Sequence, residues 1–397
     1  MFLLLFSLAR ILGIELYGEF SYSYAIITGI ATVIGEAFSV AFSRYVVFSE
    51  GKADYRNFLS LTIWGGIAVG ALCVIVLSFF SAPASSYERN AVYLLFAAFI
   101  LGFACVCNLT FTGLMYTVEA SVRWAVALSA HGLTGLLVVI AVASFSRRVE
   151  FSLLALGLCT LIAPAIAFQI MKANAAGAGR GLQRRIFSFR EMSLTLTHSG
   201  VPAVAGSMLL GAPVHIICLM IFANASSSAS EVGYFNLFFL FYILVTVLPS
   251  ALASYVVVRL AGLDGSASRL YLVLGAAASI LLPLLMFFSR DLWLCYLGDG
   301  LCEKKELLGF ALSAGGLGLM TTIMTQVLHS KRMTWIVFSA SVVYAVVYLL
   351  STIFASTEGS MFAVGLFRCF VYALIAQMLV LIVLGLRVLL RQMTGNG

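Results

Sequence analysis

The sequence predicts an all-α protein that crosses a membrane many times. Of its 397 residues, 62% are apolar and 10% are charged, whereas a soluble chain carries about 25% charged residues. The mean hydropathy is +1.08. The charged residues gather between apolar runs of about 20 residues, the length that an α-helix needs to cross the hydrocarbon of a bilayer. Because hydrocarbon offers no hydrogen bonds and the runs lack the alternation of barrel strands, each run is predicted to be a helix.

Twelve such runs follow one another along the chain. They lie at residues 1–12, 19–43, 58–80, 91–115, 124–145, 152–171, 194–222, 233–258, 270–289, 306–328, 335–355 and 361–386. An even number of crossings places both termini on one side of the membrane, and most Lys and Arg residues between the runs fall on that side. Both termini are therefore predicted to be cytoplasmic. The net charge of +7 follows from this topology, and it does not indicate nucleic-acid binding.

Two echoes at a fixed spacing predict that the chain has two halves. The motif YGEF at 17–20 returns as VGYF at 232–235, and Arg44 returns as Arg259, each 215 residues later. Repeats in the same orientation predict a pseudo-two-fold axis along the membrane normal, with a cleft between the halves. We expect an N-terminal six-helix lobe at 1–171, a cytoplasmic linker at 172–192 and a C-terminal six-helix lobe at 193–397.

The stretch ARILGIELYGEFSYSYAI at 9–26 resembles the start of the polysaccharide-repeat-unit flippases of the Wzx type. These belong to the multidrug/oligosaccharidyl-lipid/polysaccharide exporter superfamily, in which a first helix ending in A-R-x-L-G precedes a Y-G-x-F that begins the second. The stretches VGYFNLFFLFYILVTVLPSALASYVVVRLAG at 232–262 and TQVLHSKRMTW at 325–335, continuing to Cys369, are similar to the same family.

The resemblance implies a twelve-helix, two-lobed transporter of the bacterial inner membrane. It would move an undecaprenyl-diphosphate-linked oligosaccharide repeat unit from the cytoplasmic to the periplasmic leaflet by alternating access, for O-antigen, capsule or exopolysaccharide synthesis. Such a flippase is no enzyme and needs no cofactor. Its partners would be the lipid-linked oligosaccharide and the bilayer, with polysaccharide polymerase and chain-length regulator as candidate protein partners.

The first run departs from this family pattern. Only Met1 to Leu12 precede Gly13, which at 1.5 Å per residue gives about 18 Å of helix, whereas the family's first helix spans the membrane. We expect that the start of this helix is missing from the sequence; the alternative is a half-length first helix.

Three arginines are candidates for binding the diphosphate. Arg10 ends the first run, and basic residues of this region face the central cavity in the lipid-linked flippases; the alternative is snorkelling to the interface. Arg44 and Arg259 end two runs at matching repeat positions and could form a symmetric basic entrance, or each could be a positive-inside anchor. A guanidinium group suits a diphosphate because it offers paired donors to two oxygens.

Glu36 and the seventh run are candidates for coupling and gating. Glu36 is the one carboxylate well inside a run, where an ionisable group is costly unless it has a function or a partner. It could be a protonation site, a partner of Arg10 or a neutral acid bonded to a neighbouring helix. The seventh run is interrupted by prolines and glycines, which predicts a bendable gating helix, paired across the cleft with the first helix by the resemblance. Its candidates are His198 and His215 for protonation, and Pro202, Gly211 and Pro213 for gating.

Other features have alternative readings that the sequence leaves open. His131 is expected to bond locally. Arg368 lies inside the last run and is expected to have a structural partner; the alternative is contact with the substrate. The aromatic residues of YGEFSYSY and GYFNLFFLFYI could form an interfacial belt or a surface on which sugars stack. Trp124 and Trp335 form a weaker echo, 211 residues apart. Cys295 and Cys302 could form a disulfide or remain two thiols, and no metal-ligand cluster is visible.

Two other functions compete with the flippase reading. A drug or cation antiporter of the same superfamily would need carboxylates in its cavity, yet Glu36 alone qualifies while arginines are several. Membrane enzymes of polysaccharide assembly, such as polymerases or ligases, are typically chains with one long outer loop that is rich in arginine and histidine. The longest predicted outer loop here, at 290–305, is short and contains no histidine.

Overall fold

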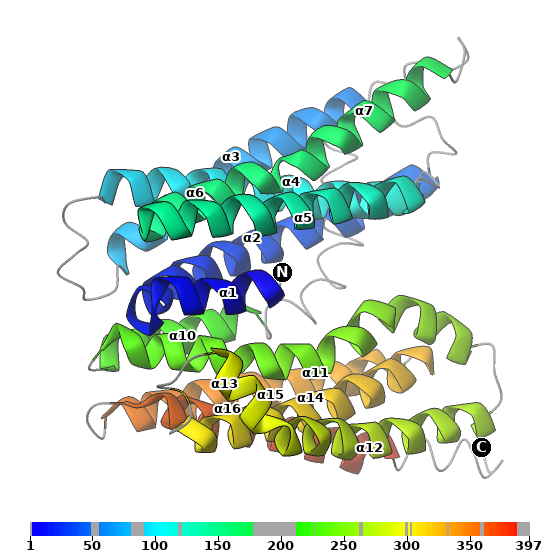
Figure 1. Cartoon of the computed structure of the whole chain (residues 1–397). Coiled ribbons are helices and arrows are strands. Elements are labelled where there is room, and N and C mark those ends of the chain that lie inside the picture. The colour runs from blue at the N-terminus through cyan, green and yellow to red at the C-terminus, as the bar shows by residue number, and fades with distance from the viewer. Residues whose placement is uncertain are drawn as a thin grey trace. The chain divides into compact units, whose positions relative to one another are not determined.

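The computed structural model describes residues 2–48, 55–80, 91–117, 121–177, 212–226, 228–261, 265–297, 301, 304–331, 333–357 and 361–386. Figure 1 shows the helices that these residues form. Up to residue 177 the helices are α1 (Phe2–Leu12), α2 (Ile14–Phe48), α3 (Tyr55–Phe79), α4 (Ala91–Thr117), α5 (Ser121–Ser146), α6 (Val149–Thr160) and α7 (Ile162–Gly177). From residue 212 they are α10 (Ala212–Ala225), α11 (Ala229–Ala261), α12 (Gly265–Phe288), α13 (Arg290–Leu297), α14 (Lys305–Ser330), α15 (Thr334–Thr357), α16 (Ala363–Val380) and the π-helical segment Leu381–Leu386.

The predicted fold class is confirmed, since each of the twelve apolar runs contains helix in the described part of the chain. Nine helical segments there are long and apolar enough to cross a membrane, and Leu3–Leu12 and Pro213–Ala225 are shorter apolar helices. The loop predicted at 290–305 differs, because it contains the short helix α13. The end of α2 also differs from the predicted run 19–43, because the helix continues four residues past Arg44 to Phe48.

Two local features explain where helices are interrupted. Gly13 has φ +79°, a left-handed conformation that glycine adopts without strain. The chain turns there, and α2 begins at the next residue. Later, the run 152–171 divides at Leu161, three residues before Pro164. Proline removes a backbone donor and crowds the preceding turn, and Leu161 instead donates to the carbonyl of Leu158 at 3.2 Å.

Residue contacts divide the chain into two units, one up to Ile216 and one from Ile217 onward, with Phe2 assigned to the second. In the first unit, α4 packs against α2, α3 and α6, and α5 packs against α6. In the second unit, α14 packs against α11, α12 and α16, and α15 packs against α16. The predicted linker 172–192 lies outside the described residues from position 178.

The packing pattern of the two units therefore corresponds helix by helix. The start of α2 at Ile14 and the start of α11 at Ala229 are 215 residues apart, the spacing of the sequence echoes. The central helices α4 and α14 correspond at nearly the same spacing.

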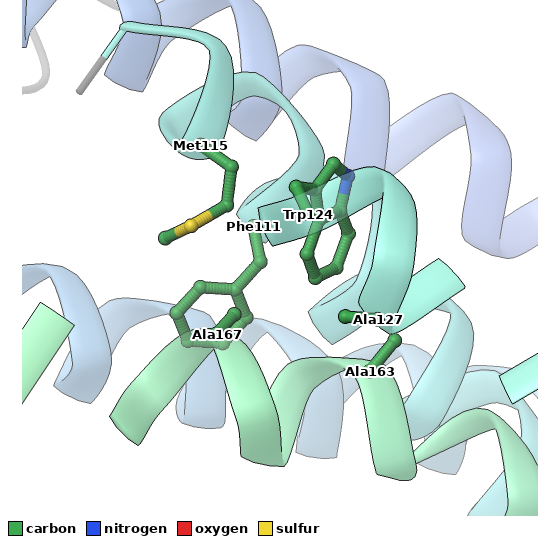
Figure 2. Close-up of a cluster of buried hydrophobic side chains, with 6 residues drawn as sticks. All are labelled: Phe111, Met115, Trp124, Ala127, Ala163 and Ala167. Carbon is green, nitrogen blue, oxygen red and sulfur yellow. The ribbon is translucent and has the colours of Figure 1, made fainter. Parts of the chain in front are cut away.

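Each unit has an apolar core around its central helix. In the first, Phe111 and Met115 of α4 pack with Trp124 and Ala127 of α5 and with Ala163 and Ala167 of α7, as Figure 2 shows. In the second, Met324, Val327 and Leu328 of α14 pack with Leu260, Ala340 and Leu381. The tryptophan echo ends in two different environments, because Trp124 is 0% exposed and Trp335 is 77% exposed.

Candidate functional site

Arg10 lies in the last turn of α1. Leu4, Leu8 and Leu12 are buried, whereas Arg10 is exposed. The carbonyl groups at a helix C-terminus carry partial negative charge, which favours a cation at this position. The arginine is thus placed for contact with solvent or ligand rather than with the core.

For the candidates on α2 and α11, the structure gives the position in the helix but not the side chain. Glu36 lies near the middle of α2, next to Gly35, which is buried against Leu109 and Val106 of α4. Arg44 lies four residues before the end of α2 and Arg259 two before the end of α11. Their side chains, and that of Glu36, lie outside the described residues.

Of the candidates in the seventh run, the structure describes two. Pro213 and His215 lie in α10, whose described residues run from Ala212 to Ala225. His198, Pro202 and Gly211 lie outside the described residues.

The structure brings together three polar groups that the sequence analysis did not connect. Pro249 lies inside α11. The Gln326 side chain of α14 donates from Nε2 to the Pro249 carbonyl at 2.8 Å, and the Tyr271 hydroxyl of α12 donates to Gln326 Oε1. The signals in the sequence were a proline within one apolar run and a single glutamine within another, but nothing in the sequence indicates that the two residues are in contact.

A second polar group lies where α11, α14 and α16 begin. Glu231 is buried, and its Oε2 accepts from the backbone N–H of Ala363 at 2.8 Å. Lys304 approaches Glu231 Oε1 at 3.8 Å and lies 4.6 Å from the ring centre of Tyr234. Glu231 therefore links the start of α11 to the start of α16.

Two predicted local contacts are confirmed. The His131 ring nitrogen Nδ1 lies 3.0 Å from the carbonyl oxygen of Cys159, which joins α5 to α6. Arg368 has a structural partner, since its guanidinium lies 3.3 Å from Glu306 Oε1, with both side chains more than half exposed.

Both readings of the aromatic clusters were wrong for their central members. Tyr17 and Phe20 of α2 are buried, as are Phe235, Phe238 and Phe241 of α11. The Phe235 ring packs on Phe367 of α16 with centroids 4.6 Å apart. These rings form the interior of each unit because aromatic side chains fill helix–helix interfaces as well as membrane surfaces. The choice between a disulfide and two thiols at Cys295 and Cys302 is untested, since Cys302 lies outside the described residues.

This arrangement of helices is similar to that of known membrane proteins. No family model matches the chain. An inward-facing multidrug resistance MATE family transporter of the MOP superfamily superposes with a TM-score of 0.69, covering 100% of this chain and 96% of that one at 14% identity. The lipid II flippase MurJ, in an inward closed conformation, superposes with a TM-score of 0.68 over 99% of this chain and 88% of that one, also at 14% identity. The chain has the fold of these transporters.

One curated relative extends the comparison to sequence. The EPS I polysaccharide export inner membrane protein EpsE of Ralstonia nicotianae is 23% identical over 392 aligned positions, which cover 90% of this chain and 83% of that protein. The chain is thus a multi-pass membrane protein that shares its fold with the MATE transporter and MurJ.

Proposed function

We propose that this protein is a flippase for a lipid-linked oligosaccharide in a bacterial inner membrane. The observation that carries the proposal is the match to a polysaccharide export inner membrane protein along 90% of the chain. The fold is also that of a lipid II flippase. The substrate is an undecaprenyl-diphosphate-linked repeat unit, which moves from the cytoplasmic to the periplasmic leaflet by alternating access.

The candidate residues have separate roles in this cycle. Arg44 and Arg259 capture the diphosphate at the cytoplasmic face, where both termini lie, and Arg10 binds it within the cavity. Glu36, His198 and His215 are the candidates for coupling to an ion gradient. Pro202, Gly211 and Pro213 allow the seventh helix to bend as the cavity changes sides. Polymerase and chain-length regulator proteins receive the product.

A multidrug or cation antiporter is the competing function, because a MATE transporter matches the fold as well as MurJ does. The charges within and next to the apolar runs favour the flippase. A cation cavity needs carboxylates, whereas the candidates here are mainly arginines, which suit an anionic diphosphate. An enzyme of polysaccharide assembly has less support, since the structures of similar fold are transporters.

The test is conditional depletion of the protein in its host. We expect surface polysaccharide to fall while lipid-linked repeat units accumulate and stay inaccessible to an enzyme added to the periplasmic side of spheroplasts. Complementation with Arg10→Ala should leave the defect, Arg10→Lys should restore part of the transport, and Arg148→Ala in the turn between α5 and α6 is the matched arginine control.

Unchanged surface polysaccharide after depletion would exclude the flippase function. A depleted strain that instead becomes sensitive to cationic drugs would support the antiporter. Accumulation of repeat units on the periplasmic side would support the polymerase or ligase.

A further inference from the structure

We propose that α11 bends at Pro249 and that the side chain of Gln326 is the clip that holds the bend in one position. The proposal concerns a conformational change within the second unit, and its test needs no substrate. Its failure is therefore distinguishable from failure of the flippase proposal.

Pro249 provides the bending point. It lies in the interior of the 33-residue helix α11. A proline has no N–H, so the carbonyl of Val245 loses its helical donor, and the ring crowds that carbonyl. Sharp bends in long helices are concentrated at such positions.

The part of α11 before Pro249 is held tightly on α14. A Cβ atom at Gly318 would lie 2.5 Å from Cε2 of Tyr242 and 3.1 Å from Cγ2 of Thr246. One turn earlier, a Cβ at Gly315 would lie 3.1 Å from Cβ of Val245. The two helices approach this closely because α14 has no side chains there, and the first part of α11 is accordingly the fixed part.

Gln326 lies about two helical turns farther along α14 and makes a directional contact with the bending point. Its side chain is buried, with 2% of its surface exposed. Nε2 donates to the Pro249 carbonyl at 2.8 Å, while Oε1 accepts from Tyr271 of α12. A buried amide is costly when its groups are unpaired, so this bridge between three helices favours one position of the chain at Pro249.

Beyond Pro249, the side chains of α11 that the structure describes are Val256 and Leu260, and both make apolar contacts. Leu260 packs with Met324, Val327 and Leu328, and Val256 lies against the same cluster. Apolar contacts are not directional, and they allow a small displacement that breaks no hydrogen bond. Arg259 lies ten residues beyond the proline, so a bend of about 20° would move its backbone by roughly 5 Å.

The first unit has neither the proline nor the glutamine at the equivalent positions. The positions 215 residues earlier are Ile34 in α2 and Phe111 in α4, where the second unit has Pro249 and Gln326. Phe111 is buried in the apolar core of Figure 2. The packing of α2 on α4 therefore needs neither proline nor amide, which indicates that both serve something other than assembly of the helices.

The experiment measures the distance between the ends of α11 and α14 by pulsed electron resonance in nanodiscs. Spin labels on p-acetylphenylalanine at Ala261 and Lys331 leave the eight native cysteines unchanged. We expect Gln326→Leu to add a population displaced by about 5 Å and Tyr271→Phe to add a smaller one. Adding Pro249→Ala to Gln326→Leu should remove the displaced population.

Matched controls come from the same unit. Gln377→Leu removes a side-chain amide from α16, and Pro283→Ala removes the interior proline of α12; both should leave the distances of the parent protein. An unchanged distribution in both Gln326→Leu and Tyr271→Phe would overturn the clip. A displaced population that survives Pro249→Ala would overturn the hinge.

Discussion

The helix pairs α2–α4 and α11–α14 occupy equivalent places in the two units but differ in the chemistry at their middle. The helices α2 and α11 each exceed 30 residues, start 215 positions apart and pack on the central helix of their unit, α4 or α14. In the first pair, the middle of α2 carries Gly35 and Glu36. In the second, α11 carries Pro249, held by Gln326. The scaffold is thus repeated while these polar features are not, and for the proposed flippase we infer that the two units contribute different steps.

The largest expected difference between equivalent positions is that between Trp124 and Trp335. Trp124 is fully buried in the core of Figure 2, and its Nε1 has no hydrogen-bond partner among the described residues, so Trp124→Ala should destabilise the protein by about 3–5 kcal/mol. Trp335 is 77% exposed, and Trp335→Ala should change stability by less than about 1 kcal/mol. Unfolding in mixed detergent micelles, followed by circular dichroism, measures both.

Trp124→Phe is the control for this comparison. Because the indole N–H is unpaired among the described residues, this variant should lose packing alone and fall between the wild type and Trp124→Ala. Equal losses in the two alanine variants would mean that the tryptophans are equivalent after all.

The next effect concerns the close approach of α11 and α14. Gly318→Ala places a methyl group 2.5 Å from the Tyr242 ring, and such overpacking should cost about 1–3 kcal/mol. At Gly309, in the same helix, a Cβ atom would meet nothing within 4 Å, so Gly309→Ala should be neutral or slightly stabilising. The same micelle titration compares them, and a neutral Gly318→Ala would mean that α14 does not hold the first part of α11.

The sequence predicted where the helices lie better than it predicted which side chains pack against one another, and the reason is physical. Runs of apolar residues and the spacing of YGEF and VGYF determine where α2 and α11 begin. The burial of Phe235 was not predictable, because lipid and protein interior are equally apolar and a helix that is apolar all round has no distinctive face. The Gln326–Pro249 contact joins residues 77 positions apart, and only tertiary packing brings them together.

Arg44 and Arg259 test whether the symmetry of the units extends to function. If both arginines capture the diphosphate, the double variant Arg44→Ala/Arg259→Ala should transport about tenfold less than either single variant, equivalent to roughly 1.4 kcal/mol. Transport of lipid-linked repeat units in complemented cells measures this, with Lys331→Ala as a control for loss of a positive charge. A double variant as active as the wild type would contradict a shared basic entrance.

The smallest effect compares two acidic residues at the starts of helices in the second unit. Glu231 is buried and accepts from the Ala363 backbone at 2.8 Å, whereas Glu306 meets Arg368 at 3.3 Å with both side chains more than half exposed. Glu231→Gln keeps an acceptor but loses the charge that strengthens this bond and attracts Lys304, so we expect a loss of about 1 kcal/mol. Glu306→Gln should cost less than about 0.5 kcal/mol, because exposed ion pairs are screened. Raising the salt concentration during the micelle titration should remove the Glu306 effect and leave most of the Glu231 effect. If salt removes both equally, Glu231 is no more than a surface ion pair, and the link between α11 and α16 must come from aromatic packing such as that of Phe235 on Phe367 and of Tyr242 on Phe370.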